Sequence, residues 1–255
     1  MKYCSAFYTD IGIKKSTNED SMLLQHAATE YGEVVFAVVC DGMGGLDKGE
    51  LASAELIRAF DSWFRTELPP MIAEKTVEFK LRDSWIDLVT HMDDKISRYG
   101  ARNGFSLGTT VVCLLLLQGR YYVMNIGDSR CYLLRDQIYQ VTKDHTVVQL
   151  EVDNGLLTPE QALVDPRRNM LLQCVGASDY VRPDFFCGEI QKNDVYLLCC
   201  DGFRHVVAPA EIYEELNVRN IPNDQAIVNR LRGLTEVIKA RGETDNISAL
   251  AVCAR

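Results

Sequence analysis

The chain has 255 residues, of which 47% are hydrophobic, so it can bury the core of one large domain or of two small ones. Its formal net charge is −9, and no segment concentrates lysine and arginine, which argues against nucleic acid or an anionic membrane as its partner. The 9 cysteines lie scattered through apolar segments without a C-x-x-C pair, which is typical of reduced core thiols and disfavours a zinc site.

The apolar runs also bear on location. None of them approaches the roughly 18 residues that a membrane helix needs. The first residues, MKYCSAFYTD, alternate like a strand instead of offering the apolar core of a signal peptide. We therefore expect a cytoplasmic protein that is neither exported nor anchored to a membrane.

The first half of the chain predicts two runs of short strands with two helices between them. Tight links at Gln118-Gly119 and Asp136-Gln137 join consecutive strands, which indicates antiparallel pairing. Each helix carries an apolar stripe at i, i+3, i+4, i+7 spacing, which predicts a side that faces the core. The expected strands cover residues 3–9, 21–25, 34–40, 109–117, 121–126, 130–135 and 138–141, and the stripes are Leu56, Phe60, Trp63 and Phe64, then Trp85, Leu88, Val89, Met92, Ile96 and Tyr99.

From residue 144 to residue 184 the hydrophobic periodicity weakens. One short helix is predicted at 158–161, where Thr158 can cap the first turn, Pro159 follows at N1 and Gln161 stands at N3. We expect the segment as a whole to be a mobile excursion over the surface. After it come strands at 185–190, 195–200 and 247–253, and an amphipathic helix with Ile227, Leu231, Leu234 and Ile238.

Runs of strands interrupted by helix pairs favour sheets with helices on their outer faces. The chain has no linker rich in proline, glycine or serine and no low-complexity tract. We therefore expect a single domain over residues 1–255, with a flap-like excursion at about 144–184.

Two predicted core strands end in the same way. The stretch VVFAVVCDG runs into Asp41-Gly42, and DVYLLCCDG runs into Asp201-Gly202. One such end is usually a turn. Here, however, two further acidic stretches, Asn18-Glu19-Asp20 and Asp245-Asn246, also lie beside core strands, which indicates a shared purpose.

That purpose fits a divalent cation. Mg²⁺ and Mn²⁺ prefer oxygen ligands from carboxylates, carbonyls and water. If Asp41, Asp201 and Asp245 meet, their charges repel one another unless a cation neutralises them. The run Gly42-Met43-Gly44-Gly45 is expected to let the backbone bend sharply and to leave the Gly42 carbonyl free to face a metal.

A dinucleotide-binding loop is the competing interpretation of a strand, Gly42-x-Gly44 and a helix. It fits poorly, because position 47 is Asp instead of Gly and Asp41 would repel a pyrophosphate. A dinucleotide-binding loop also needs an acid about 20 residues further on, at the end of a second strand. The acid near that spacing, Asp61, lies inside a predicted helix instead. The chain also lacks the G-x-x-x-x-G-K-[ST] motif of a phosphate loop.

The motifs of the chain follow the order found in one enzyme family. They are TDIGIKKSTNED, VVCDGMGG followed by GELAS, GTT at 108–110, NIGDSR at 125–130, KDHT at 143–146, LLCCDGF and ETDNIS. This set, which extends from Thr9 to Ser248, resembles the metal-dependent serine/threonine protein phosphatases of the PPM or type 2C family in their compact bacterial form. The resemblance implies an α+β fold: a four-layer α-β-β-α sandwich of two antiparallel sheets flanked by helix pairs. It also implies a cofactor of two Mn²⁺ or Mg²⁺ ions at one end of the sheets, with a third, weaker metal in some members.

The resemblance assigns the metal ligands residue by residue. Asp41 would bridge both metals and position the attacking water. The Gly42 carbonyl would bind one of the two metals. Asp201 and Asp245 would bind the other.

Other residues around the centre follow from the same motifs. Glu19 and Asp20 would hold metal-bound waters in a second layer. Asp128 matches the position that some members use for the third metal, although a Gly-Asp hairpin turn explains it equally well. His145 matches a family D-H-[ST] pattern, but a lone histidine is more often structural, so we leave it out of the catalytic set. Arg130 is expected to pair with a nearby carboxylate.

Two positions depart from the family pattern. Where members commonly carry an arginine that grips the substrate phosphate, this chain has Lys15, a flexible point charge, so we expect weaker positioning of the phosphate. The alternative is a solvated lysine beside Lys14. Met43 stands where some relatives carry histidine as a candidate general acid, so a proton for the leaving group would have to come from metal-bound water.

We predict hydrolysis of phosphoserine and phosphothreonine by direct attack of a water that two divalent metals activate. The partners would be phosphoproteins, namely substrates of a serine/threonine kinase or the kinase itself, and neither nucleic acid nor a membrane. A cysteine-phosphatase mechanism is disfavoured because no Cys-x5-Arg occurs.

Two alternatives stay open. The first is a catalytically silent regulatory domain of the same fold that binds a signalling partner, although intact Asp41, Asp201 and Asp245 count against it. The second is a two-metal phosphodiesterase or nuclease, which the acidic composition and the lack of a basic groove disfavour.

Overall fold

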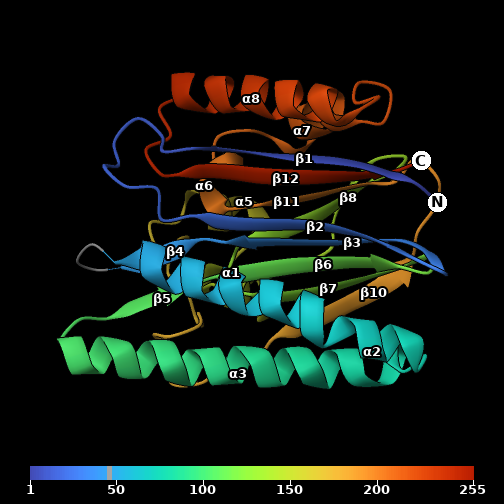
Figure 1. Cartoon of the computed structure of the whole chain (residues 1–255). Helices are drawn as coiled ribbons and strands as arrows, with labels where there is room; N and C mark the ends of the chain where they lie inside the picture. The colour runs from blue at the N-terminus through green and yellow to red at the C-terminus, as the bar shows by residue number, and fades with distance from the viewer. Residues whose placement is uncertain (45–47) are drawn as a thin grey trace.

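The computed structural model describes residues 1–44 and 48–255, so Gly45 and Asp47 of the sequence argument lie outside the described part of the chain. Figure 1 shows four layers, in which two β-sheets packed face to face lie between two groups of helices. The predicted α-β-β-α sandwich of antiparallel sheets is confirmed.

Two five-stranded sheets form the centre, and neighbouring strands in both are antiparallel. The order in the first sheet is β1 (Tyr3–Asp10), β12 (Ile247–Ala254), β11 (Val195–Cys199), β8 (Arg130–Leu134) and β9 (Ile138–Gln140). The order in the second sheet is β10 (Asp184–Glu189), β7 (Arg120–Ile126), β6 (Val111–Leu117), β3 (Gly32–Cys40) and β2 (Ser21–Thr29). A separate two-stranded ribbon pairs β4 (Gly42–Gly44) with β5 (Leu107–Thr109).

Helices cover the outer face of each sheet. The second sheet is covered by α1 (Gly49–Thr66), α2 (Leu68–Ala73) and α3 (Val77–Asn103), and the first sheet by α7 (Pro209–Leu216) and α8 (Asp224–Ala240). The shorter helices are α4 (Val147–Asp153), α5 (Pro159–Val164) and α6 (Asp201–Arg204).

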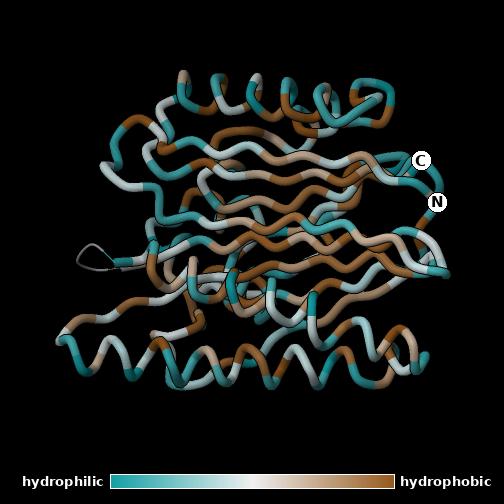
Figure 2. Tube along the Cα trace, viewed as in Figure 1, coloured by the Kyte–Doolittle hydropathy of each residue, from teal (hydrophilic) through white to brown (hydrophobic). Residues whose placement is uncertain are grey.

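Strand β3 is buried on both of its faces. Val35 and Val39 pack between the two sheets, while Phe36 faces α1 and α3. The ring of Phe36 lies 5.3 Å from that of Trp63 and 6.1 Å from that of Trp85, measured between centroids. This two-sided burial explains the unbroken apolar run of the strand, and Figure 2 shows the hydrophobic colour continuing through the central strands.

The structure corrects two of the expected elements. The strand expected at 109–117 is divided into β5 and β6, because Thr110 between them bonds to Asp41 instead of continuing one strand. The stripe of the second long helix ends before Tyr99, which is 47% exposed and meets the ring of Phe105 edge-on. The sequence pattern also fails to predict α4 and α7, since these short helices bury only one or two side chains each.

The segment 144–184 contains more regular structure than its periodicity indicates. The predicted short helix is confirmed as α5, with a capping box in which Thr158 and Gln161 bond reciprocally. Val175 bridges to Thr109 of β5, which ties the segment to the ribbon of β4 and β5. Its mobility stays a prediction.

Two expectations from composition can be compared with the fold. All 9 cysteines are free, and most are buried as expected, but Cys187 is exposed at the edge strand β10 and Cys4 is only partly buried. In residues 1–44 and 48–255, no helix has both the length and the apolar character that crossing a bilayer requires.

The strand register brings the acidic stretches to one end of the sandwich. Ser21 pairs with Cys40, so Asp20 and Asp41 are neighbours where β2 begins and β3 ends. In the first sheet Cys199 pairs with Ala249, so the end of β11 lies next to the start of β12, where residues 245–246 enter.

Candidate metal centre

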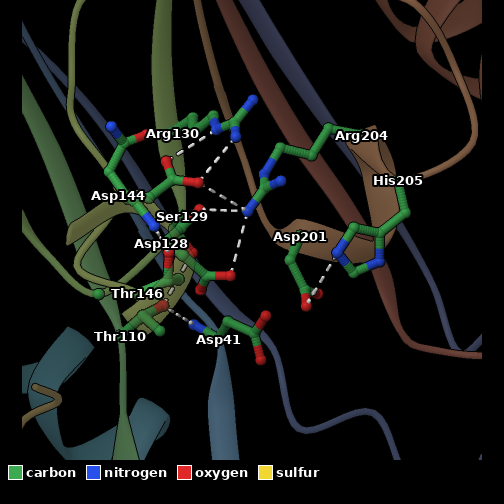
Figure 3. A network of polar contacts seen from close by, with 12 residues as sticks. Asp41, Thr110, Asp128, Ser129, Arg130, Asp144, Thr146, Asp201, Arg204 and His205 are labelled. Carbon is green, nitrogen blue, oxygen red and sulfur yellow. Dashed lines mark hydrogen bonds and ion pairs between the residues drawn. The ribbon is translucent and has the colours of Figure 1, made fainter. Parts of the chain in front are cut away.

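The main chain of Asp41 is fixed on both sides by the GTT motif. Its N–H donates to the Thr110 hydroxyl at 3.2 Å (Figure 3). Its carbonyl accepts the Thr110 N–H at 2.9 Å and the Thr109 hydroxyl at 3.0 Å. Within the described residues, no side chain makes a hydrogen bond or ion pair with the Asp41 carboxylate. This acid is therefore held in place without a protein partner of its own.

The glycines after both strands are required by close packing and not by a turn. Neither Gly42 nor Gly202 has a positive φ angle. A Cβ on Gly42 would collide with the carbonyl oxygens of Glu19 and Gly49, and a Cβ on Gly202 would collide with that of Asn246. The expected sharp bend at Gly42 is therefore wrong, since this residue begins strand β4.

The carbonyl of Gly42 does not accept the N–H of its strand partner, and its role as a metal ligand stays a prediction. Its strand partner is Thr109, whose N–H donates instead to the Val175 carbonyl at 2.9 Å. The Gly42 carbonyl thus does not receive that donor. Met43 follows in β4 opposite Gly108, and it supplies no group that could transfer a proton.

Asp20 and Asp41 converge beside a thiol. One ligand atom from each of Asp20, Asp41 and Cys200 lies within 4.8 Å of the other two. Both carboxylate oxygens of Asp20 are buried and have no hydrogen-bond partner. Burial raises the pKa of Asp20 to about 7, helped by the charges of Asp201 and Asp245 and opposed by the side chains of Ser248 and Cys200. Burial and the neighbouring Asp20 raise the pKa of Asp41 well above its usual value.

These residues fit divalent cations. A buried carboxylate oxygen without a donor is costly, and repulsion between neighbouring carboxylates adds to the cost. A bound cation would supply both the missing charge and the missing coordination. The donors are mostly carboxylate oxygens, which suit Mg²⁺ or Mn²⁺. The predicted ligands Asp41, Gly42, Asp201 and Asp245 all lie at this end of the sandwich.

Lys15 lies at the edge of this cluster. Its Nζ is 2.9 Å from Asp245 Oδ1 and 3.6 Å from Glu19 Oε2, and its side chain is partly exposed. Partial burial by itself lowers the pKa of Lys15, but the hydrogen bond to Asp245 and the negative charges of Asp245, Glu19 and Asp41 together outweigh it and raise that pKa. Glu19 also accepts the N–H of Gly49 at 3.0 Å at the start of α1, so it ties the cluster to that helix.

Asp128 is paired with an arginine that the sequence argument missed. Nη2 of Arg204 lies 3.1 Å from Asp128 Oδ2 and 3.4 Å from Asp144 Oδ2 (Figure 3). Arg130 binds Asp144 through two hydrogen bonds of 2.8 Å and 2.7 Å, which confirms the expected pairing of Arg130 with a carboxylate. Burial and the nearby Asp201 raise the pKa of Asp128 to about 7, although Arg204 opposes the shift.

His145 has a structural environment. Its Nδ1 accepts the N–H of Gly127 at 3.1 Å and lies 2.8 Å from the side-chain amide of Gln173. Its Nε2 lies 3.1 Å from Asp184 Oδ2. His145, near the start of the 144–184 segment, thus connects Gly127 between β7 and β8 to Gln173 later in the same segment. These contacts are structural, in agreement with leaving His145 out of the catalytic set.

Three further residues at this end were missed by the sequence argument. Arg204 and His205 follow directly after Asp201-Gly202-Phe203, and Glu243 stands two residues before Asp245. The available signal was their place beside a predicted ligand. Nothing local in the sequence indicates which partner each of them meets.

Known proteins resemble this chain in sequence and in fold. Residues 13–171 match the model of the protein phosphatase 2C family. The serine/threonine phosphatase stp of Listeria monocytogenes is 31% identical over 252 residues, which are 96% of this chain and 94% of that protein. The protein phosphatase PhpP of Streptococcus pneumoniae is 28% identical over 247 residues, again 96% of this chain and 94% of that protein.

Solved structures of bacterial serine/threonine phosphatases have a similar fold. The Mycobacterium tuberculosis serine/threonine phosphatase PstP/Ppp superposes with a TM-score of 0.83 at 30% identity, over 99% of each chain. The catalytic domain of PstP in complex with two manganese ions superposes with a TM-score of 0.79 at 29% identity, also over 99% of each chain. With its motifs, its sandwich and its cluster of unpaired acids, the chain belongs to the protein phosphatase 2C family, the metal-dependent PPM phosphatases.

Proposed function

We propose that this protein is a metal-dependent serine/threonine phosphatase that hydrolyses phosphoserine and phosphothreonine in phosphoproteins. The proposal rests on the pair Asp20 and Asp41, whose carboxylates converge at the end of the sheets. The Asp20 carboxylate is buried without a hydrogen-bond partner. Within the described residues, the Asp41 carboxylate has no side-chain partner either. The described fold supplies no cation for them, and a relative of the same fold was solved with two manganese ions.

The ligand set follows from the positions of the acids. Asp41 would bridge two ions, with the Gly42 carbonyl on one side and Asp201 and Asp245 on the other. When bound, divalent cations supply Lewis acidity that lowers the pKa of water and offsets charge on the phosphoryl group. Thr109 and Thr110 hold the Asp41 backbone through three hydrogen bonds, which fix where this residue lies at the end of β3. The identity of the ions, Mn²⁺ or Mg²⁺, is part of the proposal.

Lys15 is the proposed contact for the substrate phosphate. Its ammonium group lies beside Asp245 at the exposed edge of the cluster, where a phosphate could approach from solvent. Glu19 and Asp20 would bond to waters around the ions, although Glu19 already uses Oε1 to accept the Gly49 N–H.

A third, weaker metal at Asp128 is the least supported part of the ligand set. Arg204 already provides a positive charge 3.1 Å from this carboxylate. An ion at Asp128 would have to share the carboxylate with the guanidinium or displace it. We therefore expect any third ion to bind more weakly than the first two.

The 144–184 segment is the proposed determinant of substrate choice. It presents exposed apolar side chains that include Leu156, Leu163, Val164 and Tyr180, and a phosphoprotein could contact them. An opposing serine/threonine kinase, or that kinase as a substrate, and a cytoplasmic location stay predictions.

The decisive experiment measures phosphate release from a phosphothreonine peptide with Mn²⁺, with Mg²⁺ and with a chelator. We expect turnover only with a metal, and Asp41→Asn should reduce it by more than about 100-fold, since even the outer partners of a metal ligand contribute 10- to 100-fold. Asp94→Asn is the matched control, because Asp94 is exposed on α3 and, in residues 1–44 and 48–255, forms an ion pair with Arg98 alone.

Three other outcomes point elsewhere. Full activity of Asp41→Asn would refute its bridging role. Absence of turnover in a folded protein that binds Mn²⁺ by calorimetry would favour the silent regulatory domain. Hydrolysis of a phosphodiester in preference to a phosphomonoester would favour the phosphodiesterase.

A further inference from the structure

His205 lies between two carboxylates at the metal end of the sandwich. Its Nε2 is 3.5 Å from Asp201 Oδ2, and its Nδ1 is 3.3 Å from Glu243 Oε2. Figure 3 shows the ring turned toward Asp201. The imidazole is 9% exposed and the Glu243 side chain 10%, so water screens neither contact well. His205 stands four residues after Asp201 at the end of α6, which places both side chains on one face of that turn.

Glu243 connects this histidine to the second proposed ligand of the same ion. Its Oε1 accepts the N–H of Thr244 at 2.7 Å and that of Asp245 at 3.0 Å. Its Oε2 faces His205. One carboxylate therefore holds the backbone at Asp245 and also the imidazole that reaches Asp201.

The backbones of the two ligand segments already touch. Gly202 lies so close to the carbonyl of Asn246 that a Cβ would not fit, and the N–H of Cys200 donates to the Ser248 carbonyl at 3.1 Å. These contacts fix where the segments lie, but they do not fix how the Asp201 carboxylate is turned. The contact through His205 and Glu243 acts on that side chain.

We propose that His205 and Glu243 are positioning residues of the metal centre, in which His205 orients the carboxylate of Asp201 and Glu243 holds Asp245, so that both ligands meet one ion. This inference rests on the proposed function, because it requires Asp201 and Asp245 to be ligands. Partners that orient metal ligands in this way contribute about 10- to 100-fold to metal affinity. Their loss should therefore act on metal binding before it acts on the chemical step.

The test is a calorimetric titration of Mn²⁺ into the metal-free full-length protein. We expect His205→Ala to weaken one Mn²⁺ by about 10- to 100-fold. His205→Gln, which can still donate from its amide to Asp201, should recover most of that affinity. The control His91→Ala removes an exposed histidine of α3 and should leave both affinities unchanged.

A kinetic readout separates positioning from a merely structural role. In His205→Ala the Mn²⁺ concentration that gives half-maximal activity should rise, while kcat at saturating Mn²⁺ falls much less. A role in stability alone predicts instead a lower melting temperature of the metal-free protein, with unchanged Mn²⁺ affinity well below that temperature. If His205→Ala does not fold, Glu243→Gln is measured in its place, because the amide keeps an acceptor for the two backbone N–H groups.

Wild-type affinity for both ions in the folded variant overturns the positioning proposal and leaves the proposed function intact. Failure of the wild-type protein to bind Mn²⁺ overturns the proposed function, and the positioning proposal with it. The two failures are therefore distinguishable in one set of titrations.

Discussion

Two pairs of acids lie at the same end of the sandwich, and the protein supplies a positive charge to only one of them. Asp128 and Asp144 have a cation between them, because Nη2 of Arg204 lies 3.1 Å from the first carboxylate and 3.4 Å from the second. Asp20 and Asp41 have carboxylate oxygens within 4.8 Å of each other, yet within the described residues neither carboxylate has an ion-pair partner. Burial destabilises the charged form of the acids in both pairs, but only Asp128 and Asp144 have an arginine that offsets it.

This difference distinguishes acids in structural ion pairs from acids that are available to bind a ligand. Burial raises the pKa of Asp144, but Arg204 and Arg130 outweigh it and lower that pKa below its usual value. No such cation acts on Asp20, whose pKa is raised to about 7. Asp128 is intermediate, because burial and the facing Asp201 keep its pKa at about 7 in spite of Arg204. The unpaired acids are therefore the ones whose charge a bound metal ion would offset, as proposed above.

Removing the built-in cation should have the largest effect on stability. Arg204→Met leaves Asp128 buried without its partner, and breaking a buried ion pair in this way costs about 3–5 kcal/mol. At the same time the carboxylate becomes available, so calorimetry should show tighter binding of a third Mn²⁺ than in the wild-type protein. Chemical denaturation of the metal-free variant measures the stability.

The double variant Arg204→Met with Asp128→Asn is the control for this prediction. It removes both charges, so it should recover much of the lost stability and should not bind the additional ion. A wild-type protein that binds a third Mn²⁺ as tightly as the first two would contradict the idea that Arg204 competes at Asp128.

The raised pKa values predict that the metal-free protein becomes less stable from about pH 5 to pH 8. In the unfolded chain aspartates titrate near 3.9, whereas Asp20 and Asp128 keep their protons to about pH 7 in the folded chain. Between these values the folded state binds more protons, so the free energy of unfolding falls by about 1.4 kcal/mol per pH unit for each excess proton. The lowered pKa values of Asp144 and Glu243 act only below this window.

Denaturation with a chelator at several pH values tests this slope. Saturating Mn²⁺ should reduce or reverse it, because the metal binds the deprotonated carboxylates and binds better as pH rises. A metal-free protein whose stability increases steadily from pH 5 to pH 8 would show that the acid cluster does not control stability.

Asp20→Asn should separate stability from metal binding. The amide carries no charge, so at pH 8 the metal-free variant should be more stable than the wild-type protein by on the order of 1–2 kcal/mol, after the cost of burying an amide. Its Mn²⁺ affinity should fall by about 10- to 100-fold. Asp94→Asn on the surface of α3 should change neither quantity, and a destabilised Asp20→Asn variant with unchanged metal affinity would make Asp20 an ordinary structural acid.

The same comparison explains what the sequence could predict. The apolar run before Asp41, the stripes of α1 and α3 and the acids at strand ends are local signals, and they sufficed for the layers and for the group of acids. The cation of the paired acids is not local, since Arg204 and Asp128 are 76 residues apart in the chain. Which acid obtains an arginine is decided only when α6 packs against the β7–β8 connection.

The glycines illustrate a second limit. The sequence indicates that Gly42 and Gly202 matter, because each follows an acid at the end of a core strand. It cannot give the reason, since the atoms that exclude a side chain there belong to Glu19, Gly49 and Asn246. A glycine is required both where a turn needs it and where a distant backbone segment packs against it, and the sequence alone does not distinguish the two cases.

The smallest predicted effect concerns Lys15, whose ammonium group lies at the edge of the acid cluster. Its Nζ lies 2.9 Å from Asp245 but pairs with neither Asp20 nor Asp41, which leaves it able to contact a substrate phosphate. Arginine in its place offers two parallel donors to a phosphate, so Lys15→Arg should lower the KM for a phosphothreonine peptide by about threefold to tenfold, with a smaller change in kcat. Lys14→Arg is the matched control, because this neighbouring lysine is exposed. An unchanged or raised KM in Lys15→Arg, with the control also unchanged, would assign Lys15 to the support of Asp245 and leave the phosphate to the metal ions alone.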